Sequence, residues 1–413
     1  MKKTITYYQC RFKQTAPLRL SNGENEITDS ELMLDGRGLP FIPGTSFAGV
    51  LRSMVSDAKL AVELFGSDRE MHCKNGAEIP SRVIVSDAVL PDGAKVRLST
   101  RDGVGINENG TAMGKAKYNF GVAETDECYT GIIELVHGEA DDAAECLNEL
   151  MGRLAAQGIS FGARTTRGYG HMNAEIAKKS FCMPDQISEW LDFDPFEAGA
   201  FDDALLVERS SAMRRSGRTI RAELEMKGSF SVRVYSSAAG EADFAPLSNI
   251  NGRPVIPGTS WAGVFRHHML KLAEETGRSE LKSRINELFG AADDGIKRSS
   301  ISFMETEITG GTLVTTVRTA LDRFTMAPKN GALFTSAVCN GGEGMLEIRT
   351  QDHIDEALWS LLMTCLDDLN MGLLTVGGSS SIGLGIARIK QLRINGVSSD
   401  DACMNDKEVS ENA

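Results

Sequence analysis

Long apolar runs and secretion signals are missing from this 413-residue sequence. No run reaches the ~18 consecutive apolar residues of a membrane-spanning helix, so we expect no membrane partner. The first residues, MKKTITYYQCRFKQ, contain neither the apolar core nor the cleavage pattern of a secretion signal. Because 41% of the residues are hydrophobic and 24% are charged, the composition is that of a globular protein, and we expect a cytoplasmic one.

Metal-type cysteine and histidine patterns are also missing, and positive charge is scarce. The eight cysteines form no Cys-x-x-Cys pair, so we expect reduced thiols, and the six histidines show no zinc spacing. Lysine and arginine number 44 against 57 acidic residues, which gives a formal net charge of −13. Taken over the whole chain, this balance argues against a nucleic-acid partner, so any basic surface must be local.

Two acidic segments and one basic run stand out. Residues 185–203 contain seven acidic residues and no lysine or arginine, and a second acidic segment covers residues 400–413. The basic run comprises Arg209, Arg214, Arg215, Arg218 and Arg221. Charge runs are usually solvated faces, so we interpret residues 179–220 as a linker and residues 396–413 as a polar acidic tail.

What the sequence does contain is a long internal repeat. FIPGTSFAGVLR at residues 41–52 returns as VIPGTSWAGVFR at residues 255–266, with nine of twelve positions identical. ELFG occurs twice, and RTTRGYGHM at residues 164–172 corresponds to SSSIGLGIA at residues 379–387. Three landmarks in one order at similar offsets predict one domain used twice, at residues 1–178 and 221–395.

Each repeat has the same expected order of elements. An alternating segment predicts a first strand, and Pro-Gly-Thr-Ser opens a helix, at residues 45 to about 59 and 259 to about 275, with Thr or Ser as the N-cap. Strand-like segments, a second helix at 142–157 or 355–371, and a last strand follow. The order β-α-β-β-α-β predicts the α+β class, as two tandem ferredoxin-like (RRM-like) domains.

The repeated helix start has the chemistry of an anion site. The unpaired N–H groups and the positive end of the helix dipole favour phosphate there, with hydroxyls and an arginine two turns later. The alternative is an ordinary capped helix. The candidate residues are Gly44, Thr45, Ser46, Arg52, Gly258, Thr259, Ser260 and Arg266.

The Gly-rich turns GARTTRGYG and GGSSSIGLG precede a last strand and not a helix, which excludes a dinucleotide fingerprint. We expect their donors to contact a ribose-phosphate backbone, and Tyr169 to stack on a base unless it is a buried aromatic residue. The candidate donors are Arg164, Thr165, Arg167, Ser379, Ser380 and Ser381.

Residues 99–121 and 319–334 are predicted to form β-hairpin insertions. Their apolar and basic side chains are typical of wedges that unstack nucleotides, although a plain surface hairpin is the alternative. The candidate side chains are Lys115, Lys117, Phe120, Arg323, Phe324, Met326 and Lys329.

Asp29 and Asp243 each lie thirteen residues before the isoleucine of the repeated motif. A carboxylate in such a loop can hold a divalent ion or orient a ribose 2′-hydroxyl for attack on the adjacent phosphate. The alternative is an Asx turn.

The helix start, the hairpin LDRFTMAPKNGALF and the turn GGSSSIGLG together resemble the RAMP superfamily, most of all the backbone subunits of type III CRISPR effector complexes. The resemblance implies tandem RAMP domains with hairpin thumbs, bound to a guide RNA, a complementary target RNA and other effector subunits. It also implies that Asp29 and Asp243, with Mg²⁺, cleave target RNA at two sites.

Three other hypotheses remain open. The first is a non-catalytic RNA-binding subunit of the same complex. The second is a guide-RNA-processing RAMP endonuclease that uses His171 as a general acid or base. The third alternative is a nucleotide-binding enzyme unrelated to RNA.

Overall fold

The computed structural model describes residues 2–23, 31–67, 79–106, 112–207, 217–235, 242, 244–290, 298–350, 354–395 and 397–398. The chain divides into two compact units. The first comprises residues 1–100, 119–165 and 169–214, and the second comprises residues 101–118, 166–168 and 215–413. The predicted tail therefore lies almost wholly outside the described residues.

The first unit is built on an antiparallel sheet in the order β10-β9-β1-β7-β4. The strands are β10 (Leu205–Leu206), β9 (His171–Met183), β1 (Lys3–Gln14), β7 (Cys128–His137) and β4 (Val83–Val85). Side chains alternate across β1, as its sequence pattern predicts: Tyr8, Cys10 and Phe12 enter the main core, whereas Tyr7 faces the other side.

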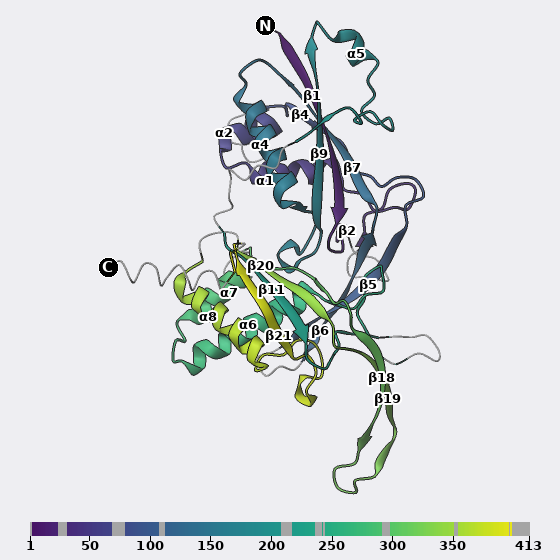
Figure 1. Ribbon diagram of the computed structural model, residues 1–413, viewed down its shortest axis with the longest axis vertical. Coiled ribbons are helices and arrows are strands. Elements are labelled where there is room, and N and C mark those ends of the chain that lie inside the picture. Colours follow the sequence, from purple (N-terminus) through teal and green to yellow (C-terminus); the bar gives the residue numbers. More distant parts are fainter. Residues whose placement is uncertain are drawn as a thin grey trace, which may run out of the picture. The chain divides into compact units, whose positions relative to one another are not determined.

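Three helices of the first unit cover one face of this sheet (Figure 1). They are α1 (Gly44–Met54), α2 (Ala58–Phe65) and α4 (Asp142–Gln157). The other face is covered by residues of the predicted linker, including α5 (Ile187–Leu191), through a smaller cluster that contains Phe201 and Phe193.

The second unit repeats the plan with the order β16-β20-β11-β21-β22. These strands are β16 (Ile301–Phe303), β20 (Glu343–Thr350), β11 (Thr219–Met226), β21 (Ala387–Ile394) and β22 (Val397–Ser398). The helices α6 (Gly258–Glu275), α7 (Leu281–Phe289) and α8 (Glu356–Met371) pack on one face (Figure 1). Two arginines of the predicted basic run are paired here: Arg218 with Glu356, and Arg221 with Glu347.

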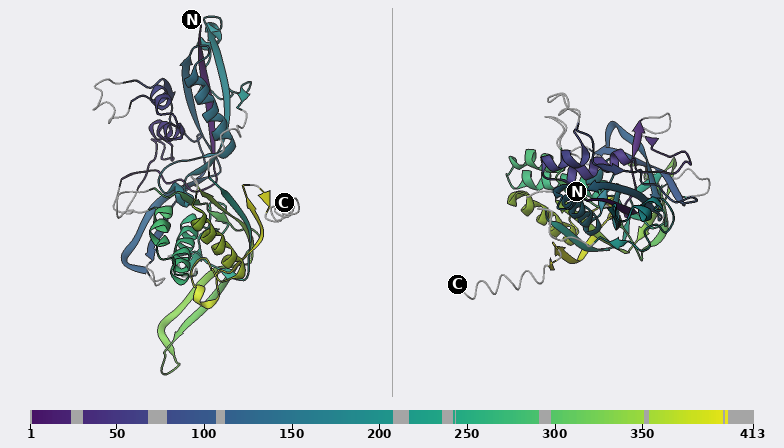
Figure 2. Two further views of the ribbon diagram at one scale, coloured as in Figure 1. Left: turned by 90° about the vertical axis from the view of Figure 1, so that its left-hand side faces the viewer. Right: turned by 90° about the horizontal axis from the view of Figure 1, so that it is seen from above.

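Two hairpins complete the described fold: β5 (Val96–Ile106) with β6 (Ala112–Thr125), and β18 (Thr312–Leu321) with β19 (Pro328–Asn340). Figure 2 shows the β18–β19 hairpin extending away from the helices of its unit. The remaining short strands are β2 (Ser21–Gly23), β3 (Glu31–Leu32), β8 (Ile159–Ser160), β12 (Ser229–Phe230), β13 (Arg233–Tyr235), β14 (Phe244–Pro246), β15 (Val255–Ile256) and β17 (Thr306–Glu307).

The predicted α+β class is confirmed, but the first predicted helix is wrong in length. It ends at Met54, and a separate helix, α2, starts after Asp57, whose carboxylate accepts hydrogen bonds from the N–H groups of Lys59 and Leu60. An aspartate N-cap of this kind stabilises a new helix start more than continuation of the old one. No helix among the described residues is long and apolar enough to cross a membrane.

Candidate functional site

Both repeated helix starts require glycine for a packing reason. A Cβ atom on Gly44 would lie 2.4 Å from the backbone oxygen of Val85, and one on Gly258 would lie 2.0 Å from that of Phe303. Real Cβ atoms do not approach a backbone oxygen so closely, so each helix start is pressed against a strand of its own unit. This packing explains why the glycine recurs.

The expected Thr and Ser N-caps are wrong. Pro43 and Pro257 are the N-cap residues, so the four hydroxyl residues Thr45, Ser46, Thr259 and Ser260 lie within the first helical turn, and no N-cap side chain accepts a hydrogen bond at either start. Proline suits this position because its φ is fixed and its missing N–H needs no partner.

The two helix starts differ in their electrostatics. Bridges pair Ile42 with Ala88 and Ile256 with Thr306, so the residues before these partners, Asp87 and Glu305, are equivalent. The Gly44 N–H donates to Asp87 Oδ1 at 2.7 Å, which puts a carboxylate at the positive end of α1.

Glu305 instead forms an ion pair within the second unit. Arg101 Nη1 lies 2.5 Å from Glu305 Oε2, and the two side chains are 4% and 9% exposed. Asp87 thus places negative charge at the first helix start, whereas its equivalent, Glu305, pairs with an arginine. The electric field that an anion would meet therefore differs between the two helix starts.

The predicted phosphate-contacting arginines of the two helices have helix-linking roles. Arg52 Nη1 donates to the backbone oxygen of Gly66 at 2.8 Å, at the end of α2. Arg266 Nη2 donates to Asn286 Oδ1 at 2.9 Å, on α7. Each therefore ties the repeated helix to the helix that follows it.

The two Gly-rich turns have the same backbone geometry. The turn is closed by a bond from Phe161 N to Gly170 O in the first unit and from Val376 N to Gly385 O in the second, both 3.0 Å. Arg164 and Ser379 occupy the left-handed region at the same point, with φ of 59° and 64°. A 3-10 helix follows each of them, Thr165–Arg167 and Ser380–Ile382. Of the predicted donors in the first of these turns, Arg164 and Thr165 belong to the first unit, whereas Arg167 belongs to the second.

In the first unit, the helix start and the Gly-rich turn share a core. The rings of Phe47, in the first turn of α1, and Phe161, directly before the Gly-rich turn, lie 5.7 Å apart and nearly perpendicular. In the second unit, the corresponding residues Trp261 and Val376 belong to one core cluster. In the first unit this packing holds the helix start beside the Gly-rich turn, and in the second unit both segments contribute to the same core.

Two aromatic residues predicted to meet nucleotides are buried. Tyr169 is 3% exposed and Phe120 is 1% exposed, and their rings pack edge-on 5.6 Å apart. The guanidinium carbons of Arg19 and Arg164 lie 4.3 Å and 5.1 Å from the Phe120 ring centre. Arg19 was missed from the sequence, because nothing in its strand pattern indicates which ring it meets.

The tip of the β18–β19 hairpin has the predicted exposed character. Phe324 is 92% exposed and Met326 is 69% exposed, and Arg323 and Lys329 are exposed beside them. Backbone N–H groups of Thr325 and Phe324 donate to Asp322, which lowers the pKa of its carboxyl group and fixes the tip. The side chains of Lys115 and Lys117 lie outside the described residues.

Asp29 and Asp243, the predicted catalytic and metal-binding residues, also lie outside the described residues. Where the structure is described, no three His, Cys, Asp or Glu side chains cluster as a metal site. His171 is 6% exposed, and its Nδ1 lies 3.1 Å from Ser160 Oγ. A buried histidine has no access to a large substrate, which disfavours the guide-processing alternative.

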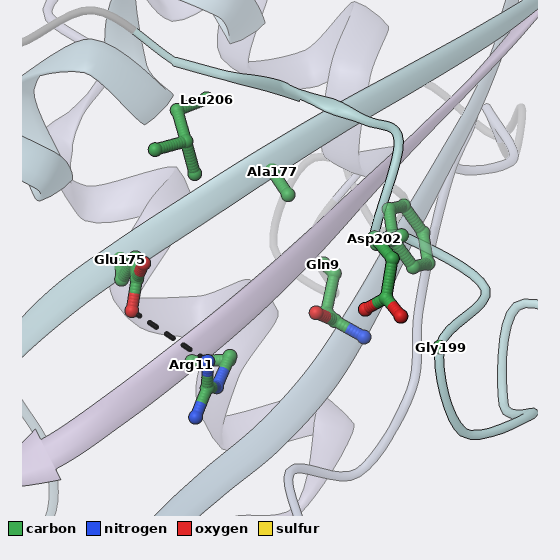
Figure 3. A pocket seen from close by; sticks show the side chains of 8 residues that line it. Gln9, Arg11, Glu175, Ala177, Gly199, Asp202 and Leu206 are labelled. Carbon is green, nitrogen blue, oxygen red and sulfur yellow. Dashed lines mark ion pairs between the residues drawn. The ribbon is translucent and has the colours of Figure 1, made fainter.

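A pocket lies on the face of the first sheet that residues of the predicted linker cover (Figure 3). Gln9 and Arg11 of β1 and Glu175 of β9 line it, and Arg11 pairs with Glu175 at 3.7 Å. Asp202 adds a second carboxylate, and none of the predicted site residues lines this pocket. Its acidic lining does not suit a polyanion.

Comparison with known proteins gives one family match. The model of the RAMP superfamily matches residues 11–173 and 237–388, one segment in each repeat. No curated protein matches the sequence. A chain in the cryo-EM structure of a type III-B Cmr-beta complex in the apo state is 12% identical over 43% of this chain and 96% of its own length, with a TM-score of 0.33. A chain in a Cmr-beta complex bound to cognate target RNA is 14% identical over 43% of this chain and 61% of its own length, also with a TM-score of 0.33.

Proposed function

Because this chain belongs to the RAMP superfamily, matched once in each repeat, we propose that it is a guide-RNA-binding backbone subunit of a type III CRISPR complex. Its partners are then a guide RNA, a complementary target RNA and other effector subunits. The observation that carries the proposal is the tandem family match, together with one helix start and one Gly-rich turn in each matched segment.

We further propose that both units are ferredoxin-like domains with hairpin thumbs. The strand orders β9-β1-β7-β4 and β21-β11-β20-β16 support this, because both correspond to positions 4-1-3-2 of a β-α-β-β-α-β chain. All these pairings are antiparallel, and helices pack on one face of each sheet.

RNA binding is proposed at the helix start and the Gly-rich turn of each unit. A short turn with a left-handed residue presents successive backbone N–H groups, and such concave arrangements bind phosphate. The exposed apolar tip at Phe324 and Met326 is suited to separating stacked nucleotides, with Arg323 and Lys329 near the backbone.

Cleavage is proposed at Asp29 and Asp243, one site per repeat. The ribose 2′-hydroxyl loses its proton to solvent as its oxygen attacks the adjacent phosphorus, the bond from phosphorus to the 5′-oxygen breaks, and that oxygen takes up a proton, so the products carry a 2′,3′-cyclic phosphate and a 5′-hydroxyl group. A single carboxylate suits Mg²⁺, which keeps several waters and binds substrate phosphates, and its charge would stabilise the attacked phosphate. The competing proposal is a structural subunit that binds RNA without cutting it.

The test is cleavage of target RNA by the reconstituted complex with Mg²⁺, resolved on a sequencing gel. Asp29→Ala and Asp243→Ala should each remove one distinct product, and the double variant should remove both. Asp126→Ala and Asp367→Ala, exposed aspartates in the first and second units, are matched controls that should leave the ladder intact. An unchanged ladder with the double variant would establish the structural alternative.

A further inference from the structure

Each unit holds one arginine, not singled out from the sequence, against its Gly-rich turn and an aromatic ring. We propose that these two arginines, Arg19 and Arg233, bind phosphates of the RNA backbone, Arg19 together with Arg164. The inference rests on the proposed RNA-binding function and adds to it the side chains that supply local positive charge in a chain of net charge −13.

In the first unit, two guanidinium groups share one phenyl ring. Arg19 and Arg164 approach the buried Phe120 ring at 4.3 Å and 5.1 Å. The backbone of Arg19 joins the turn as well, because its oxygen accepts the N–H of Ala163 at 2.9 Å. A cation on a buried ring face is held in one orientation, so its side chain loses little further conformational entropy when a ligand binds.

In the second unit, the arrangement recurs through a different residue. The Arg233 guanidinium carbon lies 5.3 Å from the Phe244 ring centre. The turn is equally near, since a Cβ atom on Gly378 would lie 2.8 Å from Arg233 Nε. The guanidinium therefore again lies between a phenyl ring and the backbone of the Gly-rich turn.

The two arginines are not in the same register, which makes the recurrence informative. The bond from Ala163 N to Arg19 O corresponds to the bond from Gly378 N to Ser231 O, so Ser231 is the equivalent of Arg19. Arg233 lies two residues further along, on the same side of an extended chain. A guanidinium thus reaches the Gly-rich turn in both units although the repeats supply it from different positions.

Arginine is the side chain suited to this task. Its planar fork donates to phosphate in bidentate fashion, it stacks on aromatic faces, and it is more weakly hydrated than lysine. The adjacent turn residues, Arg164 and Ser379, have left-handed backbone conformations that orient further N–H donors. Guanidinium and turn together form a site for a phosphodiester, one in each unit.

The experiment measures binding of the full-length chain to a fluorescein-labelled oligouridine by anisotropy over a series of salt concentrations. Arg19→Ala and Arg233→Ala should each weaken binding about tenfold, and removing one phosphate-binding charge should reduce the slope of log K against log salt by about 0.7. Arg19→Lys keeps the charge without the planar fork and should lie between wild type and alanine.

Matched controls remove the same charge elsewhere in each unit. Arg11→Ala, on β1, and Arg393→Ala, near the far end of β21, change exposed arginines outside the Gly-rich turns, each in an ion pair of 3.7 Å, and should leave the salt slope unchanged. If an alanine variant fails to fold, as judged by thermal unfolding, the glutamine variants Arg19→Gln and Arg233→Gln, which also remove the charge but keep a longer side chain, decide by the same slope.

The outcomes separate the proposed site from the proposed function. Wild-type binding with unchanged slopes for every Arg19 and Arg233 variant would overturn this inference and leave the proposed function standing, since the cation–π contacts would then be purely structural. Failure of the wild-type chain to bind the oligouridine would overturn both. A reduced slope confined to the two arginines supports the site.

Discussion

Breaking the buried Arg101–Glu305 ion pair should destabilise the second unit strongly. At 2.5 Å, the attraction between unit charges is about 7 kcal/mol at an effective dielectric constant of about 20. Because both side chains are more than nine-tenths buried, desolvation of the two ions costs several kcal/mol each and cancels most of that attraction. The intact pair therefore adds little net stability, yet a lone charge left behind is costly.

We accordingly expect Glu305→Ala to lower the free energy of unfolding by about 3–5 kcal/mol, because the buried guanidinium of Arg101 loses its carboxylate partner Glu305. The double variant Arg101→Met/Glu305→Met removes both charges and fills similar volume, so it should lie within about 1 kcal/mol of the wild type. The single variant should thus be much less stable than the double one.

Urea unfolding followed by tryptophan fluorescence measures this for the second unit alone. In a Trp190→Phe background, the remaining tryptophans, Trp261 and Trp359, both belong to that unit. Glu275→Ala is the control, because it breaks an exposed pair with Lys271 at 3.7 Å and should cost only about 0.3–0.5 kcal/mol. A Glu305→Ala variant as stable as this control, or a double variant less stable than the single one, would refute the reasoning.

Three further predictions concern the first unit. Gly44→Ala should destabilise the chain by about 2 kcal/mol, because it forces a Cβ atom against a backbone oxygen of a strand. Gly49→Ala, in open space on the same helix, should stabilise the chain by about 0.5–1 kcal/mol. The midpoints of urea unfolding distinguish the two variants. Burial acts to raise the pKa of the Asp141 carboxyl group, but the hydrogen bonds from Arg82 and from the α4 backbone N–H groups outweigh it, so this pKa is lowered. The stability that the charged carboxylate gives the fold is therefore present above about pH 3.9 and is lost as the pH falls through the folded pKa. Asp141→Asn should therefore be less stable at pH 7 and show a flatter acid limb in pH-dependent unfolding. Asp87→Asn should raise the affinity for oligouridine a few-fold, since it removes negative charge at a helix start, and an unchanged affinity would exclude that start as a phosphate-binding segment.

Much of the architecture was predictable because it depends on local periodicity. The helix predicted at 142–157 matches α4, and the Pro-Gly-Thr-Ser motif opens a helix in both units. The internal repeat and the RAMP family were also predicted and are confirmed by the two matched segments.

What the sequence could not supply are contacts between distant segments. Phe120 and Tyr169 have the composition of nucleotide-stacking residues, but they bury each other because β6 and the Gly-rich turn meet only in three dimensions. Arg19 has no local signal at all, since its ring partner is about a hundred residues away. Asp29 and Asp243, which lie outside the described residues, stay predictions.

The division of the chain has a consequence for how this protein can be taken apart or exchanged. Strand β5 begins in the first unit and, from Arg101 onward, belongs to the second, so the folded units do not coincide with the repeats. Expressing the two repeats as separate fragments would place Arg101 and Glu305 on different chains. Recombination with a homologous gene between the repeats would likewise give Glu305 a partner from another sequence. The second folded unit therefore depends on residues of the first repeat, and a graft of the second half should carry residues 101–118 and 166–168 with it.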